Sequence, residues 1–380
     1  MTARAMGQPV RATARSVRIA LGVIWLADGL LQLQPKMFGV GFANDVILPS
    51  ARGQPGIVSG AITHTAHLIS TQPVATDLVF AGTQLLIGAG LLIHETVKPA
   101  LALSFVWALG IWSLGEGFGG LLDGTAMPLT GAPGAALLYV AIGLMVWPRK
   151  KPAGPDGPAA GEGLLGEAGA QTIWALVWCG LGILWLLPAS SDSGALSSAL
   201  SGVAASQPGW LAHLQLAVAH SLRSGGASVA VGAGLLSFVI GVGPLLTRRS
   251  TIFLIGGAAM ALDFWVLGQG FGQFTSGMTT DPNTGPLLIL LAFALAPAPG
   301  RERPGGEVHA DDRTVVDLHH YLPEFVEVAG GTHGSLDTGT TDSLGRLSSP
   351  ARDRSWCVQR RRVRRAFFMP TAAPPVPRPY

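Results

Sequence analysis

The sequence predicts an all-α, polytopic membrane protein with about eight transmembrane helices, arranged as two tandem four-helix repeats. Four observations predict this fold class. The 380 residues are 48% hydrophobic and 12% charged, with a mean hydropathy of +0.42, which is too apolar for a soluble domain of this length. Several apolar runs approach the roughly 18 to 20 residues that cross a bilayer. One motif occurs twice, and basic residues gather in alternate loops.

The repeated motif is WSLGEGFG at residues 112–119, which returns as WVLGQGFG at residues 265–272, an offset of 153 (265 − 112). Glu116 in the first copy corresponds to Gln269 in the second. Glycine lets helices approach closely in a membrane, and a carboxyl or amide there needs a partner or a cavity. We therefore expect Glu116 and Gln269 to face one shared cavity where the two repeats meet.

Further matches at the same offset indicate an internal duplication. They include tryptophan, histidine and proline, which chance does not readily align in apolar sequence. The matched pairs are Trp25 and Trp178, Gly29 and Gly182, Pro35 and Pro188, His67 and His220, Gly124 and Gly277, and Pro133 and Pro286.

The first repeat is expected over residues 16–151. Apolar runs predict its spans at 16–33, 74–93, 100–117 and 135–147. Pro35 ends the first run and Pro99 opens the third, as proline does at helix boundaries. A shorter, half-polar pattern at 56–71 predicts an interfacial or re-entrant helix.

The second repeat is expected over residues 171–298. Its predicted spans are 172–187, 227–246, 251–270 and 285–296, with a short helix at 209–222. Composition predicts a cytoplasmic arm at 1–15, a flexible Gly/Ala/Pro-rich linker at 152–170 and a disordered cytoplasmic tail at 299–380.

Loop charge predicts the topology and the partners. Basic residues such as Lys98, Arg149 and Arg248 follow the even-numbered spans, so both termini are expected in the cytoplasm of a cell-membrane protein. An even number of spans per repeat makes the repeats parallel. The net charge of +3 is small, and we expect the lipid bilayer, not nucleic acid, as partner. Two cysteines exclude a disulfide framework.

Polar residues of the spans form the first candidate site. Glu116, Gln269 and Asp28, with the neighbouring Trp112 and Trp265, are the predicted ligand-binding residues, because an intramembrane carboxyl is a functional candidate by default. The alternative is a hydrogen bond between packed helices, or a residue at the membrane interface.

Histidines form a second candidate site. His64 and His67 share one helix face, and so do His213 and His220 if 209–222 is helical. Imidazoles on two facing helices would hold a haem iron or a metal ion. The alternative is interfacial histidine bonded to backbone or solvent.

Two stretches resemble the DoxX-like superfamily of four-span membrane proteins: SVRIALGVIWLADGLLQL at 16–33 and GTQLLIGAGLL at 82–92. Gln84 and Gln32 stand where the family pattern has Glu and Lys. The resemblance implies a four-helix unit, here doubled, and a link to membrane oxidoreductase systems that pass electrons to quinone, with other redox subunits as partners. A redox-associated or small-molecule-handling protein is therefore the leading hypothesis. A transporter and a non-catalytic subunit of a membrane complex are the alternatives.

Overall fold

The computed structural model describes residues 13–149, 159–247 and 250–296. All regular elements in these ranges are helices, and the one strand-like pairing there is an isolated bridge between Pro148 and Gly163. Five helical segments are long and apolar enough to cross a membrane: Pro73–Leu92, His94–Gly115, Gly166–Leu186, Gly226–Leu246 and Ser250–Gly268. The prediction of an α-helical, multi-pass membrane protein is thereby confirmed. Most of the predicted arm and the whole predicted tail lie outside the described residues.

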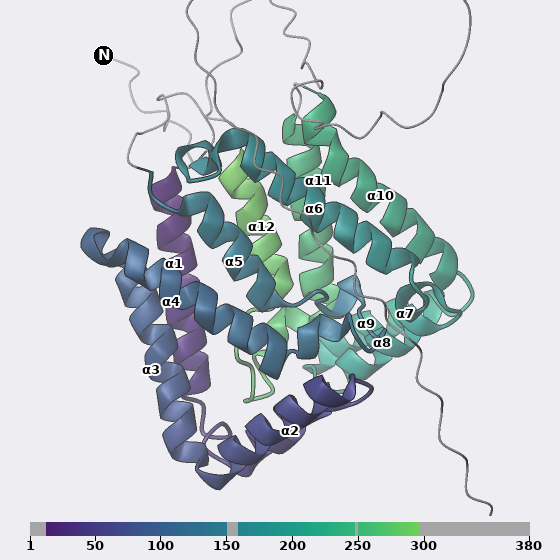
Figure 1. Cartoon of the computed structure of the whole chain (residues 1–380). Coiled ribbons are helices and arrows are strands. Elements are labelled where there is room, and N and C mark those ends of the chain that lie inside the picture. Colours follow the sequence, from purple (N-terminus) through teal and green to yellow (C-terminus); the bar gives the residue numbers. More distant parts are fainter. Residues whose placement is uncertain (1–12, 150–158, 248–249, 297–380) are drawn as a thin grey trace, which may run out of the picture. The chain divides into compact units, whose positions relative to one another are not determined.

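The first half contains five α-helices and a short irregular segment. The helices are α1 (Ala14–Gln32), α2 (Gly56–Thr71), α3 (Pro73–Leu92), α4 (Val97–Gly110) and α5 (Ala135–Val146). The irregular segment joins α1 to α2 and consists of the π-helix η1 (Phe42–Ile47) and the 3-10 helix η2 (Leu48–Ala51). Helix α2 has the predicted bounds and crosses one end of the other helices (Figure 1).

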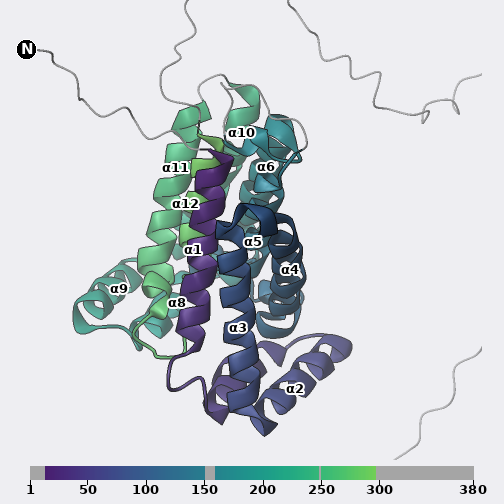
Figure 2. The ribbon, with the colours of Figure 1, turned by 90° about the vertical axis from the view of Figure 1, so that its left-hand side faces the viewer.

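The second half contains the remaining α-helices. They are α6 (Gly166–Leu186), the short α7 (Pro188–Ser191), α8 (Ala195–Ala204), α9 (Gly209–Ser221), α10 (Gly226–Leu246), α11 (Ser250–Asp263) and α12 (Thr284–Leu295). Helix α12 packs against α5 and α1 of the first half, so one hydrophobic core serves both halves (Figure 2).

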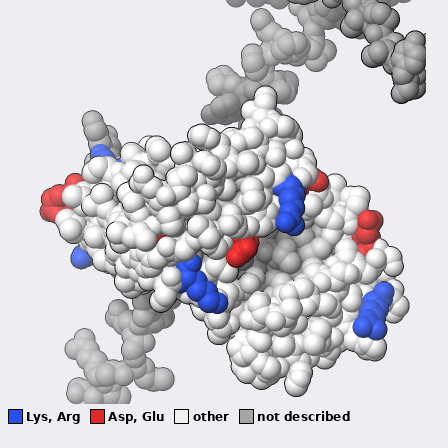
Figure 3. Space-filling view, turned by 90° about the horizontal axis from the view of Figure 1, so that it is seen from below, with Lys and Arg blue, Asp and Glu red and all other residues white. Residues whose placement is uncertain are grey.

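Small residues bring the longest helix pairs together. α1 packs along α3, and a Cβ at Gly88 would lie 2.8 Å from the carbonyl oxygen of Gly22. α6 packs along α10, where a Cβ at Gly182 would lie 3.1 Å from the carbonyl oxygen of Gly234. These close backbone approaches are typical of helix packing in membranes. The face seen from the α2 end carries only scattered charged side chains (Figure 3).

The chain differs from the prediction in the expected linker and in an additional helix of the second half, among other places. The 3-10 helix η7 (Ala159–Glu162) and the start of α6 lie within the predicted linker 152–170. Ala159 and Ala160 are buried, and Glu162 Oε2 accepts a hydrogen bond from the Ala14 amide at 3.1 Å. The side chains of Ala159 and Ala160 pack against the ends of the neighbouring helices. Composition alone could not distinguish such a packed segment from a flexible linker. Helix α8, of 10 residues, was not predicted.

Candidate functional site

The repeated motif forms the same left-handed turn in both copies. Residues 117–120 have φ values of 55°, 57°, 62° and 76°, and residues 270–273 have values of 52°, 56°, 75° and 55°. Glycine adopts this conformation without the steric cost that other residues incur. The glycines at 117, 119, 270 and 272 are therefore explained by the turn itself, whereas Gly268, which precedes the second turn, lies against the backbone of Leu129.

The motif tryptophans fasten each turn to the chain that follows it. Trp112 Nε1 donates to the carbonyl oxygen of Pro133 at 2.7 Å, and Trp265 Nε1 donates to that of Pro282 at 2.9 Å. Pro133 therefore corresponds to Pro282, an offset of 149 (282 − 133). The predicted match with Pro286 is wrong, because Pro286 lies inside α12. Trp112 and Trp265 hold the turns and do not line the cavity described below.

Glu116 and Gln269 perform matching structural roles at two helix N-termini. Glu116 Oε1 accepts a hydrogen bond from the Ala136 amide of α5 at 3.2 Å. Gln269 Oε1 accepts one from the Gly285 amide of α12 at 3.0 Å, while its Nε2 donates to Thr284 Oγ1 at 2.8 Å. Each side chain satisfies amides that have no partner inside their own helix.

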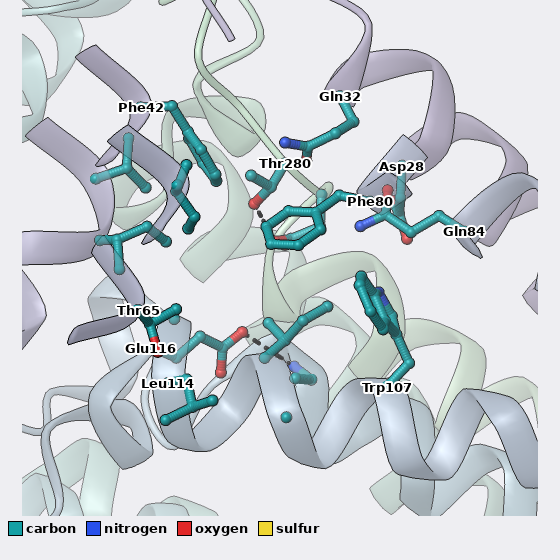
Figure 4. A pocket seen from close by; sticks show the side chains of 18 of the residues that line it. Asp28, Gln32, Phe42, Thr65, Phe80, Gln84, Trp107, Leu114, Glu116 and Thr280 are labelled. Carbon is teal, nitrogen blue, oxygen red and sulfur yellow. Dashed lines mark hydrogen bonds between the residues drawn. The ribbon is translucent and has the colours of Figure 1, made fainter. Parts of the chain in front are cut away.

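One cavity of about 430 Å³ lies inside the first half (Figure 4). Side chains of α1 to α5 and η1 line it, together with the segment that precedes α12. Its polar or ionisable lining residues are Asp28, Gln32, Thr65, Thr76, Gln84, Glu116, Tyr139, Thr280 and Asp281, and its other aromatic residues are Trp25, Phe42, Phe80 and Trp107. The structure brings Asp28 and Glu116, two of the predicted ligand-binding residues, into one cavity. Gln269 does not line it, so the expected cavity shared by Glu116 and Gln269 is wrong.

Asp28 is the most deeply buried acid of this cavity. Its side chain is 1% exposed, and its Oδ2 accepts a hydrogen bond from the Tyr139 hydroxyl at 2.5 Å. Its Oδ1 has no hydrogen-bond partner among the described residues. Gln84 is 4% exposed, and its Oε1 also lacks a partner within the described ranges. Unpaired buried acceptors are costly, so the cavity offers unsatisfied acceptors to a ligand.

Asp281 brings a third acid to the cavity from the other half of the chain. Its Oδ1 accepts from the Asn283 amide at 2.7 Å, and its Oδ2 from Thr280 Oγ1 at 2.9 Å. Burial raises the pKa of Asp281. Burial, and then the nearby Asp281 carboxylate, raise the pKa of Glu116, which follows the last residue of the His94–Gly115 segment, to about 8. Glu116 therefore carries its proton for most of the time at neutral pH.

The histidines are not brought together. His64 and His67 on α2, and His213 and His220 on α9, are all exposed. The two helices lie apart in both Figure 1 and Figure 2. Within the described ranges, no group of three or more His, Cys, Asp or Glu side chains could hold a metal ion. This arrangement gives the predicted haem or metal site no support.

Sequence reasoning missed several residues of the cavity. Tyr139 had a usable signal, since it is one of three tyrosines in the chain and lies in an apolar run. Asp281 had none, because an acid in a loop is ordinarily solvated. Nearby, Gln32 Nε2 donates to Asp77 Oδ1 at 2.5 Å, which is the hydrogen bond between packed helices that was the alternative for the intramembrane acids.

A second cavity, of about 620 Å³, lies at the other end of α1. Arg15, Arg18, Arg149 and Glu162 line it. Only Arg18 of these is buried, so this is mainly an open, basic surface. The acidic cavity is therefore the candidate functional site.

Comparisons with protein-family models, curated proteins and solved structures found no match to this chain. The resemblance to the DoxX-like superfamily accordingly stays a prediction, and function has to be argued from the cavity.

Proposed function

We propose that this chain is a multi-pass membrane protein that binds a small, largely apolar organic molecule in the first-half cavity. The observation that carries the proposal is a cavity inside a helical membrane protein whose apolar walls surround the unpaired acceptors Asp28 Oδ1 and Glu116 Oε2. Ligand sites are typically concave and mostly apolar, with a few polar groups that fix orientation.

The lining suggests how such a molecule would lie. Asp28 and Gln84 come from α1 and α3, and Glu116 lies at the opposite wall (Figure 4). The polar end of the ligand would donate hydrogen bonds to these groups, and the apolar body of the ligand would contact Phe42 of η1 and Trp107 of α4. Thr65 and Leu68 of α2 close another side, so movement of α2 would admit or release the ligand.

The redox form of this proposal has a quinol as ligand. A quinol carries two hydroxyl donors, which suit two carboxyl groups with unpaired oxygens on opposite walls, and the resemblance to DoxX-like proteins favours quinone-linked chemistry. If the protein is instead a transporter, the ligand enters the cavity from one side of the membrane and leaves on the other side. A non-catalytic subunit would use the same cavity to bind a partner's cofactor or lipid.

The proposed architecture is eight spans in two parallel repeats with both termini in the cytoplasm. The matching turns, tryptophan hydrogen bonds and helix caps 153 or 149 residues apart support the duplication. Single cysteines in a background lacking Cys179 and Cys357 test the topology by labelling from each side. We expect positions 44 and 193 to react from outside and position 150 from the cytoplasm; outside labelling at 150 would contradict the arrangement.

Calorimetry on detergent-purified protein tests the binding function. Trimethylhydroquinone and its oxidised quinone are the probes, and Asp28→Asn is the test variant. Asp263→Asn is the matched control, because Asp263 is exposed and does not line the cavity. We expect the quinol to bind and Asp28→Asn to weaken it about tenfold, the cost of one charge-assisted hydrogen bond. Equal affinity in both variants would contradict the site.

A further inference from the structure

We infer that the preferred ligand of this cavity is an organic cation with an aromatic or apolar body, whose binding displaces protons from the acids of the cavity. This inference rests on the proposed function and names the ligand class of the same site. It is carried by the charge of the lining, by its aromatic faces and by a buried carboxylate oxygen that has no partner among the described residues.

The charge of the lining is one-sided. Asp28, Glu116 and Asp281 face the cavity, and among its lining residues, all of which the structure describes, there is no Lys, Arg or His. Three acids without a basic side chain leave a negative potential as they ionise, which a positive ligand neutralises.

The unpaired oxygen of Asp28 is a second observation that favours a cation, independent of how many acids line the cavity. Only one of its two oxygens is used, by Tyr139, although the side chain is 1% exposed. Helix capping uses Oε1 of Glu116 and leaves its Oε2 without a partner among the described residues, whereas local hydrogen bonds use both oxygens of Asp281. Asp77 Oδ2 is also unpaired among the described residues, but Asp77 does not line the cavity, so the free oxygen of Asp28 is one that a bound cation could satisfy.

Aromatic side chains supply the second recognition element. The rings of Trp25 and Tyr139 lie 4.4 Å apart beside Asp28, and those of Phe80 and Trp107 lie 5.4 Å apart with their planes at 76°. Aromatic faces attract cations, most strongly in a desolvated site. The indole N–H of Trp25 lacks a partner among the described residues, but so does that of Trp178. This donor is therefore not a sign of a ligand.

Proton release follows from the environment of Glu116. The titratable groups that face it across the cavity are Asp28 of α1, Tyr139 of α5 and Asp281 before α12; α2, α3, α4 and η1 add none to the lining. With a pKa raised to about 8, Glu116 is mostly protonated at pH 7. A cation that binds to its carboxylate must displace that proton, so affinity rises with pH until the carboxyl is already ionised.

The test compares a permanent cation with its uncharged isostere. Benzyltrimethylammonium and neopentylbenzene have the same shape, so calorimetry on the full chain in detergent isolates the contribution of charge. We expect the cation to bind at least about tenfold more tightly at pH 8, and its affinity to rise by up to about tenfold per pH unit between pH 6 and 8 if one proton is released. Glu116→Gln should flatten that pH dependence, and Asp28→Asn should weaken the cation about tenfold, while Asp263→Asn should change neither.

The outcomes separate the two proposals. If trimethylhydroquinone or neopentylbenzene binds as tightly as the cation, or more tightly, at every pH, the cation inference is overturned and the proposed function stands. If none of the three molecules binds to folded protein, both fail. Folding of each variant is checked by its circular dichroism and melting temperature. A variant that does not fold is replaced by Tyr139→Phe, which removes the hydroxyl partner of Asp28 and should alter the pH dependence of cation binding.

Discussion

The two halves of the membrane region bury different chemistry at positions 153 residues apart. Asp28 and Gln32 on α1 correspond to Leu181 and Trp185 on α6, and all four side chains are buried. At the offset of 149 that applies after the turns, Tyr139 corresponds to the buried Leu288. Trp185 fills its position by packing against Phe264 at a ring distance of 5.8 Å.

The segments beside these positions differ in the same way. Residues 42–51 form a π-helix followed by a 3-10 helix, whereas residues 195–204 form the regular helix α8. π-Helical turns are frequent at functional sites, and Phe42, Val46 and Ile47 of this one line the cavity. The comparison teaches that one helical frame can hold either a polar cavity or packed apolar side chains, according to a few buried positions.

The largest effect on stability is expected when the buried acid of the first half and the corresponding leucine of the second half are exchanged. Leu181→Asp would place a carboxyl among packed apolar side chains and should cost about 3 kcal/mol or more of stability, because nothing is arranged to receive it. The reciprocal Asp28→Leu should cost less, within about 2 kcal/mol, since apolar burial offsets the lost partner of Tyr139. Thermal unfolding of both variants in detergent measures the difference; equal losses would contradict it.

The turns should respond unequally to alanine. A Cβ at Gly119 would overlap the carbonyl of Pro133, whereas one at Gly272 would lie 3.0 Å from the carbonyl oxygen of Pro282. We expect Gly119→Ala to cost about 3 kcal/mol and Gly272→Ala about 1 to 2 kcal/mol, from crowding and left-handed backbone. Gly232→Ala on α10 is the control, because its Cβ would meet no atom within 4 Å. If Gly232→Ala lost as much stability as the two turn variants, crowding and left-handed backbone would not explain their losses.

The pair Gln32 and Asp77 tests whether a polar contact of the first half can be converted to the apolar type of the second. Gln32→Leu should cost about 2 kcal/mol, because it leaves a buried carboxyl unpaired. Adding Asp77→Ala, which reproduces the buried Ala230 of α10, should recover part of that loss. A double-mutant cycle measures the coupling, and strictly additive losses would show that the two side chains act independently.

The smallest effect at acidic pH is expected for Glu116→Gln, which makes the first cap resemble Gln269 and should become stabilising relative to the natural protein as pH rises. Since the folded-state pKa of Glu116 is raised to about 8 from 4.5, the folded protein holds this proton more tightly than the unfolded chain does. Its contribution to stability is therefore full below pH 4.5 and is lost as pH rises toward 8. Melting temperatures from pH 5 to 9 should fall more steeply for the natural protein than for Glu116→Gln.

Glu95→Gln is the control for that series, because Glu95 is exposed between α3 and α4. It should leave the pH dependence unchanged. Parallel curves for the natural protein and Glu116→Gln would mean that the carboxyl is wetted and free of the cavity's influence.

The sequence predicted more of the frame than of the site. Hydropathy located the long helices, and proline positions located several of their ends, because both act within one stretch of chain. Asp28 and Glu116 were found as candidates because acids in apolar runs are conspicuous. Their partners Tyr139 and Asp281 were not, since they meet Asp28 and Glu116 only through packing between helices distant in sequence. The change of offset from 153 to 149 was missed because Pro286 offered a false match to Pro133.

The central claim, that the first-half cavity is the ligand site and the second half is packed, is tested most directly by photo-crosslinking. A photoreactive azidobenzyltrimethylammonium would be irradiated with the full chain in detergent at pH 8, and the labelled peptides identified by mass spectrometry. We predict labels on residues lining the cavity, such as Phe42, Phe80 and Trp107, that benzyltrimethylammonium competes away and Asp28→Asn strongly reduces. Labels spread equally over α6, α8 and α10, or labels indifferent to Asp28→Asn, would contradict the account.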